Sequence, residues 1–464
     1  MRLVRLLIAR ATSSASLVFF AFLPALIVVS AQVARRAPAD AFLLDGARLI
    51  DGTGGTPLES SSILVQDGRI ASVGRRGTVR APEGVRRIDV TGQTIIPALV
   101  DTHVHLGYQK GLSFATANFT RDTLIDHLRR FAYCGVGAVL SLGTDPGELP
   151  FQIRAEQEAG RLDGALYLSA GRGLAAPNAG PGTPELKPSA YGVSTEDEAR
   201  AAVREQVAHH VAFIKIWVDD RNGTVEKLRP SLYRAAIDEA HRANTRVIAY
   251  VFYLDDAKDL VRAGIDGFAH LPRDREADAD LSASMKAHGV FMIPNLSVSE
   301  NGVHAEAPAW LDDPFLRETV SQEEIDRLRA SYARRSPEAV QRARATYAGM
   351  QRSLMTLKRA GVTIAFGTDA GAVRDHFYAY MDHHELQLMV AAGLSPMEAL
   401  TAATRTSAQV LRLGDRGTIA PGKSADLVVL RADLLSDIAN TETIEAVYLR
   451  GVEVDREHKG HKGY

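Results

Sequence analysis

Short apolar runs alternate with amphipathic helical patterns through the middle of the chain, and this alternation constrains the fold more than any other feature. Eight such runs are present, with the sequences IPALVDTHVH, VGAVLSLGTD, GALYLSAG, VAFIKIW, RVIAYVF, IDGFAH, GVFMIPN and VTIAFGTDAG. Most of them precede a helical pattern, as residues 230–244 and 255–264 illustrate. We therefore expect an α/β fold with a parallel (β/α)8 TIM barrel, whose chemistry lies at the C-terminal ends of the strands.

Short strand patterns with Gly and Asp turn signals flank this middle on both sides. They occur in AFLLDGARLIDGTG and SSILVQDGRIASVG before it, and in SADLVVLRADLL and IEAVYLRGVEVDR after it. Two β segments that bracket one long middle predict a discontinuous, β-sandwich-like accessory domain. The expected divisions are a signal peptide over 1–31, a linker over 32–40, the accessory domain over 41–96 and 415–464, and the barrel over 97–414.

The first residues have the pattern of an export signal. Arg2, Arg5 and Arg10 precede an apolar run over 17–29, and the Val-Ser-Ala sequence at 29–31 is a small-residue cleavage pattern. The run is short for a membrane span and contains a proline, so cleavage is favoured over an uncleaved anchor. We therefore expect an exported protein, either periplasmic or secreted.

The composition argues against nucleic-acid binding and against a disulfide-based scaffold. Charged residues make up 24% of the 464 residues, and the formal net charge is only −2, so no basic stripe is expected. The single cysteine, Cys134, excludes an intrachain disulfide and stands in an apolar setting typical of a core residue. The expected partner is a small-molecule substrate, with homo-oligomerisation left open.

Two histidines close the first predicted barrel strand as an H-x-H pattern. His103 and His105 are two residues apart, and the strand period of two directs both imidazoles to the same side. Two converging imidazoles make half of a metal site. Because 14 histidines can produce an H-x-H pattern by chance, its position at a strand end is what favours a function.

Three further strand ends supply polar residues. Lys215 lies between two isoleucines on a buried strand, where a cation is costly and burial lowers the pKa of the amine. His270 follows the sixth predicted strand, and Asp369 follows the eighth. Taken singly, each has an ordinary structural explanation: a core ion pair for Lys215, a satisfied core histidine for His270, and a helix N-cap for Asp369.

Taken together, these positions resemble the metal-dependent amidohydrolase superfamily, in particular its prolidase-like and imidazolonepropionase-like members. The resemblance rests on IPALVDTHVH at 96–105, Lys215, His270, GTD at 367–369 and GTIAPGKSADL at 417–427. It extends from about Phe42 to the C-terminus. Ordered motifs at several strand ends are more specific than any one of them.

The resemblance implies a centre of two divalent metal ions. His103, His105 and Asp369 would hold one ion. Lys215, carboxylated on its amine to a carbamate, would bridge to a second ion, which His270 and a histidine at the end of the fifth strand would also hold. Water between the ions would attack a carbonyl, and Asp369 would pass its proton to the leaving amine. By ligand type zinc is expected, with manganese, cobalt or iron as alternatives.

The chain departs from the family pattern at the fifth strand. Alignment of the strand–helix–strand stretch that ends at His270 places Tyr250 where the fifth-strand histidine is expected. Three interpretations stay open. Tyr250 ligates as a phenolate, because a dication lowers the pKa of a phenol; the second metal site is weak or empty; or catalysis is lost and a binding pocket is kept.

Three weaker candidates for substrate binding lie near strand ends and a helix start. Tyr108 and Arg273 follow predicted strands and could orient a substrate carbonyl or carboxylate. His384 is a candidate to face the barrel mouth, although a surface position is favoured. Its stretch, HHELQLM at 383–389, lacks the second histidine of an H-E-x-x-H zinc motif. His127 stands in an amphipathic stretch and is expected to be solvated.

The function predicted from these features is an exported metal-dependent hydrolase that cleaves an amide, peptide-type or cyclic amide C–N bond of a small molecule through a metal-activated water. The C–N preference comes from the family resemblance alone, because lactone or ester hydrolysis would use the same centre. The alternative from another class is a catalytically impaired or inactive ligand-binding protein, a consequence of Tyr250.

Overall fold

The computed structural model describes residues 41–456, which form a mixed α/β structure. The predicted signal peptide and linker, residues 1–31 and 32–40, lie outside the described residues, as do residues 457–464. Within the described part, no helix combines the length and the hydropathy needed to cross a membrane.

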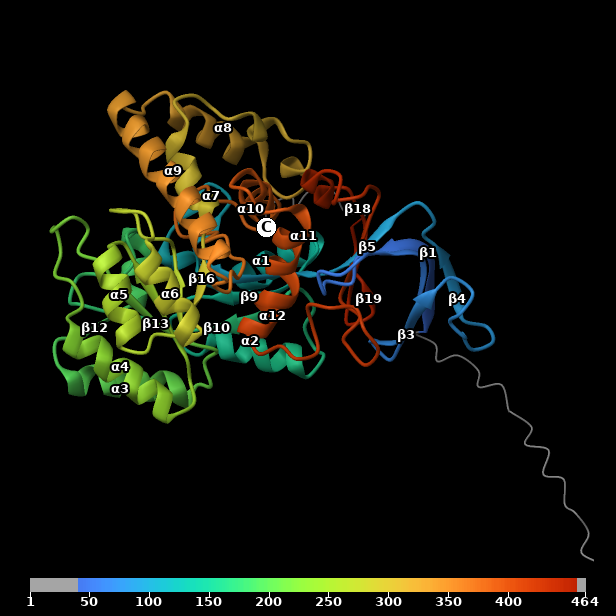
Figure 1. Cartoon of the computed structure of the whole chain (residues 1–464), viewed down its shortest axis with the longest axis horizontal. Helices are drawn as coiled ribbons and strands as arrows, with labels where there is room; N and C mark the ends of the chain where they lie inside the picture. The colour runs from blue at the N-terminus through green and yellow to red at the C-terminus, as the bar shows by residue number, and fades with distance from the viewer. Residues whose placement is uncertain (1–40, 457–464) are drawn as a thin grey trace, which may run out of the picture.

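An eight-stranded mixed sheet joins the two ends of the described chain. Its strands are β1 (Phe42–Leu49), β2 (Leu58–Gln66), β3 (Arg69–Arg75), β4 (Arg86–Asp89), β5 (Thr94–Pro97), β17 (Leu427–Leu430), β18 (Ile444–Leu449) and β19 (Val452–Glu453). Their order is β19-β18-β17-β5-β1-β2-β3, with β4 paired to β1. The two β segments meet where β5 pairs with β17 in antiparallel register. Figure 1 shows this sheet at one end of the molecule.

The remaining long strands are all parallel to their neighbours and fall into two sheets. The first sheet, in the order β10-β9-β6, contains β6 (Leu99–Val104), β9 (Val136–Ser141) and β10 (Leu166–Ser169). The second, in the order β12-β11-β13-β14-β15-β16, contains β11 (Leu174–Ala175), β12 (Tyr191–Gly192), β13 (Ile214–Val218), β14 (Val247–Val251), β15 (Gly267–Ala269) and β16 (Phe291–Ile293). Seven of the eight predicted barrel runs contain one of these strands.

The eighth predicted run, VTIAFGTDAG, forms bridges instead of a continuous strand, and these bridges connect the two parallel sheets. Ile364 pairs with Met292 of β16, and Ala370 pairs with Val104 of β6, both in parallel. The N–H of Thr102 also donates to the carbonyl of Phe366 at 3.0 Å. At the other side, the N–H of Ala212, just before β13, donates at 2.9 Å to the carbonyl of Ser169 at the end of β10.

Helices follow most of the parallel strands, as the alternating pattern predicts. They are α1 (Arg121–Tyr133), α2 (Leu149–Glu158), α3 (Glu196–Ala208), α4 (Pro230–Arg242), α5 (Leu254–Arg262), α6 (Ala279–His288), α7 (Leu296–Glu300), α8 (Gln322–Tyr332), α9 (Pro337–Arg359), α10 (Tyr380–Ala391), α11 (Pro396–Thr401) and α12 (Ser407–Val410). Capping boxes at Thr195 and Ser321 fix the starts of α3 and α8. Figure 1 shows α8 and α9 projecting above the strands.

Two clusters of apolar side chains hold these layers together. One cluster gathers residues from β6, β9, β10, β14, β15 and β16, including Val100, Leu140, Leu168, Ile248 and Ile293. These side chains meet on one shared face of the parallel strands. The larger cluster packs the helices against the strands and extends into β17 and β18.

Candidate metal centre

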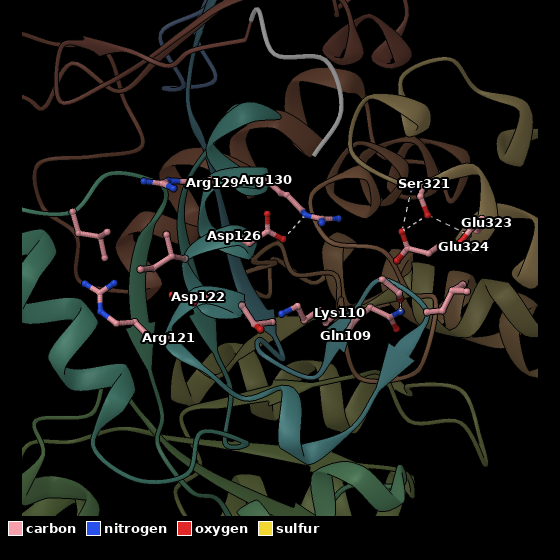
Figure 2. Close-up of a pocket in the computed structure, with 15 residues that line it drawn as sticks. Gln109, Lys110, Arg121, Asp122, Asp126, Arg129, Arg130, Ser321, Glu323 and Glu324 are labelled. Atoms are coloured by element: carbon pink, nitrogen blue, oxygen red, sulfur yellow. Dashed lines mark hydrogen bonds and ion pairs between the residues drawn. The ribbon is translucent and has the colours of Figure 1, made fainter. Parts of the chain in front are cut away.

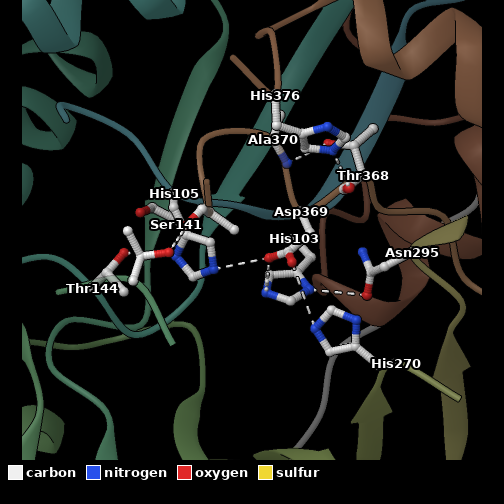
Figure 3. Close-up of polar contacts among 12 residues, drawn as sticks. His103, His105, Ser141, Thr144, His270, Asn295, Thr368, Asp369, Ala370 and His376 are labelled. Atoms are coloured by element: carbon white, nitrogen blue, oxygen red, sulfur yellow. Dashed lines mark hydrogen bonds and ion pairs between the residues drawn. The ribbon is translucent and has the colours of Figure 1, made fainter. Parts of the chain in front are cut away.

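The ends of the parallel strands bring together four of the residues that the sequence singled out. His103 lies in β6, His105 directly after β6, His270 directly after β15, and Asp369 in the bridging segment. The Nε2 atoms of His103 and His105 lie 3.1 and 3.0 Å from Oδ1 of Asp369, and Nε2 of His270 lies 3.7 Å from Oδ2. Figure 3 shows the three imidazoles around this carboxylate.

Three of these side chains, His103, His270 and Asp369, fit a divalent cation, and His105 adjoins them through Asp369. One ligand atom each from His103, His270 and Asp369 lie within 4.8 Å of one another, and all three residues are buried. Among the described residues, Oδ1 of Asp369 has no hydrogen-bond partner although two imidazole nitrogens approach it. Buried acceptors that face one another without a proton between them are costly unless a cation lies among them. Imidazole and carboxylate suit zinc, and also manganese, cobalt and iron.

Two residues that the sequence did not single out orient the H-x-H histidines. Nδ1 of His103 lies 3.0 Å from Oδ1 of Asn295, and Nδ1 of His105 lies 2.7 Å from Oγ1 of Thr144. When Nδ1 donates this hydrogen bond, the Nε2 lone pair is free for a metal, the usual arrangement at a ligating histidine. Both partners stand at the ends of predicted strand runs, so their position at the same rim was the available signal.

Asp101, two residues before His103, ties β6 to the segment that carries Asp369. Its Oδ1 accepts from the N–H of His103 at 2.8 Å, and its Oδ2 accepts from the hydroxyl of Thr368 at 2.6 Å. Burial raises the pKa of Asp101 to about 7, although these hydrogen bonds oppose the shift. This carboxyl therefore fixes the spacing between the first-strand and eighth-strand ligands.

Lys215 lies in β13 as a fully buried lysine without a partner. Its Nζ makes no hydrogen bond within residues 41–456 and lies 5.5 Å from the centroid of the Trp217 ring. A Cβ on Gly143 would come within 2.6 Å of Cγ of Lys215, so only glycine leaves room for this side chain. Burial lowers the pKa of Lys215 to about 7, against the attraction of Asp369. A neutral amine is therefore available near pH 7, which N-carboxylation requires.

Tyr250 stands in β14, the fifth of the predicted barrel strands, at the position where the resemblance leads us to expect a histidine. Its ring contacts the ring of His270 edge-on, with centroids 4.8 Å apart. Its hydroxyl accepts a hydrogen bond from Nη2 of Arg273. Burial raises the pKa of Tyr250, although the cation of Arg273 lowers it in part. The hydroxyl is therefore held as a neutral phenol against a guanidinium group.

The electrostatics of the centre favour neutral imidazoles beside one carboxylate. Burial holds the pKa values of His103 and His270 well below the usual range, and Lys215 adds to both shifts. Burial alone would raise the pKa of Asp369, but His103 and His105 outweigh it and lower the pKa to about 2. Neutral imidazole and ionised carboxylate are the forms that bind metal.

Three residues of the centre have left-handed backbone conformations. The φ angles are +72° at His270, +49° at Asn295 and +63° at Asp369. Such conformations cost about 1–3 kcal/mol each in residues other than glycine and persist where the surrounding structure imposes them. They turn each side chain inward at the point where its strand ends.

The three weaker candidates for substrate binding occupy three different environments. Arg273 lies beside the centre through its contact with Tyr250. Tyr108 is fully buried and donates its hydroxyl to the carbonyl of Thr144 at 2.5 Å. His384 is buried in α10 with its Nε2 3.4 Å from Oε2 of Glu300, so the favoured surface position is wrong. The prediction of a solvated His127 is also wrong, because that residue is buried and Nε2 contacts the carbonyl of Gln109.

A cavity of about 840 Å³ lies away from these ligands. Figure 2 shows it between α1 and the start of α8, where Lys110, Arg121, Asp122 and Glu323 are among its lining residues. None of the four metal-centre side chains lines it. Despite its volume, this cavity is therefore not the candidate active site.

Comparison with known proteins gives a consistent result over most of the chain. The model of the amidohydrolase family matches residues 94–454. An uncharacterized protein of Mycobacterium tuberculosis (strain ATCC 25618 / H37Rv) is 28% identical over 410 residues, which cover 81% of this chain and 93% of that protein. The imidazolonepropionase of Salinispora tropica is 26% identical over 392 residues, 80% of this chain and 86% of that enzyme.

The fold of this protein is also similar to that of solved crystal structures. The crystal structure of a proposed prolidase from Bifidobacterium longum superposes with a TM-score of 0.74 at 26% identity. The match covers 91% of this chain and 96% of that protein.

Proposed function

Because this chain belongs to the amidohydrolase family and is similar to its prolidases and imidazolonepropionases, we propose that it is a metal-dependent hydrolase that cleaves a C–N bond of a small molecule. One observation carries the proposal: three buried imidazoles and the carboxylate of Asp369 converge at the strand ends. An amide, a peptide-type bond and a cyclic amide are the expected substrates, since prolidases and imidazolonepropionases are among the relatives.

We propose a centre with one tightly held ion. His103, His270 and Asp369 would hold it, because their ligand atoms lie within 4.8 Å of one another, and His105 would complete the set, since its Nε2 lies 3.0 Å from Oδ1 of Asp369. A bound divalent ion, zinc by the donor set, makes water acidic and polarises a carbonyl oxygen. A second ion would need a ligand at position 250, and the hydroxyl of Tyr250 is occupied by Arg273. Carboxylation of Lys215 stays a proposal that depends on such a second ion.

Side chains of this protein would transfer the proton, orient the imidazoles and bind the substrate. Asp369, ionised and central, accepts a proton from the attacking water and delivers it to the leaving nitrogen. Asn295 and Thr144 hold two imidazoles in the ligating orientation. Arg273 presents a cation beside the centre, suited to a substrate carbonyl or carboxylate.

We propose that the parallel strands form a closed (β/α)8 barrel and that the mixed sheet is a discontinuous accessory domain. The bridges at Ile364 and Ala370 and the hydrogen bond from Ala212 to Ser169 support closure. The pairing of β5 with β17 supports one accessory domain built from both ends of the chain.

Export is proposed from the sequence of residues 1–31 alone. The test is N-terminal sequencing of the protein recovered from its native host, for which a start near residue 32 is expected. A protein recovered from the cytoplasm with an intact first segment would contradict export.

The central experiment measures metal content together with activity. Metal per chain is determined on the purified protein, before and after incubation with zinc or manganese and bicarbonate, and a panel of amides, esters and lactones is screened. We expect at least one tightly bound ion and turnover of an amide. Turnover of lactones or esters only would favour that alternative, and a protein that binds no metal would favour a ligand-binding role.

A further inference from the structure

We propose that a basic cavity away from the metal centre is a second binding site of this protein and takes a phosphate group. The cavity has a volume of about 450 Å³. Its polar lining consists of four cations and two uncharged side chains: Arg405, Arg412, Arg416, Lys423, Gln409 and Thr418. None of the described residues that line it is acidic, although the formal net charge of the chain is −2. The inference does not depend on the proposed hydrolase function.

The cavity lies at the other end of the parallel strands from the metal centre. Nη1 of Arg412 donates at 3.3 Å to the carbonyl of Asn244, three residues before β14 begins. Tyr250 and His270 stand near or just after the C-terminal ends of β14 and β15. The five residues of β14 span roughly 16 Å. The cavity and the metal centre are therefore separate sites.

Three of the four cations have no carboxylate partner within residues 41–456. In this part of the chain, the side chain of Arg405 makes no hydrogen bond or ion pair. The side chains of Arg412 and Lys423 donate there only to backbone carbonyls, at 3.3 and 2.7 Å. Only Arg416 forms a buried ion pair. Three positive charges therefore line one cavity without a counter-charge from the described protein.

The acidic residues nearest in sequence are engaged elsewhere. Asp426 is the partner of Arg416, and its Oδ1 also accepts from the N–H of Arg450 at 2.6 Å. Asp415 lies 3.8 Å from Nε of Arg416 and 3.9 Å from Nη1 of Arg69. Neither carboxylate lines the cavity. An anion from solution is therefore the natural partner of the three cations.

The positive potential also acts on Arg246, just before β14. Burial lowers the pKa of this guanidinium to about 10, and the charge of Arg412 adds to the shift, while Asp266 opposes it. Like charges held around one cavity repel one another, and a bound anion removes that repulsion.

The donors of the cavity match a phosphate better than a carboxylate. A guanidinium donates in pairs to the oxygens of an anion, and one guanidinium is enough to engage both oxygens of a carboxylate. Two guanidinium groups without carboxylate partners, an ammonium, a hydroxyl and an amide require an anion with more oxygens, which a tetrahedral phosphate supplies.

The size of the cavity leaves room for more than the phosphate itself. Small-molecule sites commonly measure about 300–1,000 Å³. A Cβ on Gly414, one of the lining residues, would meet nothing within 4 Å, so open space adjoins this wall. The expected ligand is therefore a molecule that carries a phosphate group.

The test is calorimetric titration of the full-length protein with inorganic phosphate at constant ionic strength, balanced with sodium chloride. We expect one saturable site per chain. Gln409→Glu, at an exposed position of α12, keeps the size of the side chain and places a carboxylate at the cavity, so it should weaken binding at least tenfold. Gln341→Glu, at an exposed position of α9, is the matched control and should bind as the unmodified protein does.

Arg405→Gln removes one unpaired cation and should also weaken binding at least tenfold. Its control is Arg359→Gln, an exposed position at the end of α9, which should leave binding unchanged. If Arg405→Gln does not fold, Gln409→Glu decides alone, because an exposed change of equal size leaves the packing intact.

Co-sedimentation with phosphatidylcholine vesicles, with and without phosphatidic acid, distinguishes a free phosphate from a lipid headgroup. Binding of inorganic phosphate without co-sedimentation identifies a soluble ligand. Co-sedimentation that requires phosphatidic acid and that Gln409→Glu abolishes identifies a lipid phosphate. Binding to neither source overturns the site. Equal binding by Gln409→Glu and Gln341→Glu also overturns it, since the phosphate would then bind elsewhere.

Discussion

Lys215 is the residue whose chemistry depends most on its surroundings. It is a lysine with 0% of its surface exposed, no hydrogen-bond partner, and aromatic rings beside it. In this environment the ammonium form is the costly one, so the amine is the native form at moderately alkaline pH.

Stability should therefore increase with pH above neutrality. The pKa of Lys215 is about 7 in the folded protein and 10.5 in the unfolded chain, so between these values the unfolded chain binds more protons. The free energy of unfolding should rise across this window, by at most about 5 kcal/mol. Denaturant unfolding of chelator-treated protein at several pH values measures it. Lys215→Met should flatten the dependence, and parallel curves for the two proteins would contradict the low pKa.

The hydroxyl of Tyr250 gives a second prediction at the same scale. Tyr250→His should raise the metal content above one ion per chain and increase turnover, because it restores a ligand next to His270 and Lys215. Tyr250→Phe is the matched control and should leave the metal content unchanged, since the hydroxyl contacts Arg273 instead of the cluster. Loss of metal from Tyr250→Phe would mean that Tyr250 is itself a ligand. Elemental analysis of the three proteins decides.

At the scale of elements, α8 is tied to the metal centre by one arginine. Arg327 pairs with both oxygens of Asp375, in the segment that follows Asp369, and also donates to the carbonyl of Leu112, in the hairpin after the H-x-H histidines. Asp375 is buried, so the ion pair is shielded from solvent. Because the candidate ligands are at most 5% exposed, we expect that a substrate can reach them only when a covering segment moves.

Removal of this contact should release α8. In Arg327→Ala, amide hydrogen exchange across residues 322–332 and 109–114 should become roughly tenfold faster or more, since an unpaired buried carboxylate costs about 1–3 kcal/mol. Metal loss to a chelator should also accelerate. The control is Arg329→Ala on the same helix, whose partner Asp312 is exposed. Equal exchange in the two variants would show that Arg327 does not hold the helix.

Elements with strong periodicity were predictable, and those that depend on backbone strain were not. The helical pattern over 230–244 corresponds to α4, because its apolar spacing and terminal proline are local signals. The eighth run gives only two bridges, at Ile364 and Ala370, and between them the chain takes the left-handed φ of +63° at Asp369, which a regular strand does not contain. For the same reason Asn295 could not be assigned: its contact with His103 depends on a left-handed turn that the sequence does not specify.

On the scale of the whole molecule, the mixed sheet has an apolar cluster of its own and also contributes side chains to the cluster that surrounds the parallel strands. Val428, Ile444 and Val447 belong to the same apolar cluster as the helices around the strands. Gly135, between α1 and β9, approaches this contact so closely that a Cβ would lie 2.9 Å from Cγ2 of Val428. We therefore expect one cooperative unfolding transition.

Gly135→Ala tests this coupling. Gly135 has φ of +79° and Gly147 has φ of +69°, but nothing lies within 4 Å of a Cβ at Gly147. Both alanine variants should lose about 1 kcal/mol to backbone strain, and Gly135→Ala should lose a further 1–3 kcal/mol or so to overpacking. Calorimetry should give a lower Tm for Gly135→Ala, in a single transition. Equal Tm values for the two variants would indicate that the side chain of Val428 shifts to make room for the added methyl group.

The sequence was informative about the overall arrangement because strand ends on one rim are fixed by topology. The predicted strand ends put His103, His105, His270 and Asp369 on one rim, and the resemblance to the amidohydrolases grouped them as metal ligands. The partners of Tyr250 and His384 could not be predicted, because Arg273 and Glu300 reach them through side-chain rotamers and loop paths with no periodic signal.

A single residue, Ala98, separates β5 of the mixed sheet from β6, which carries His103. β5 of the mixed sheet and the H-x-H pair thus belong to one continuous extended segment of the chain. A slip of β5 by one residue against β17 would carry the histidines along by about 3.3 Å, more than the ~2 Å bond between zinc and an imidazole nitrogen. The register of β5 in the mixed sheet therefore sets the position of the two histidines. A change in that register would abolish metal binding although every ligand residue was still present.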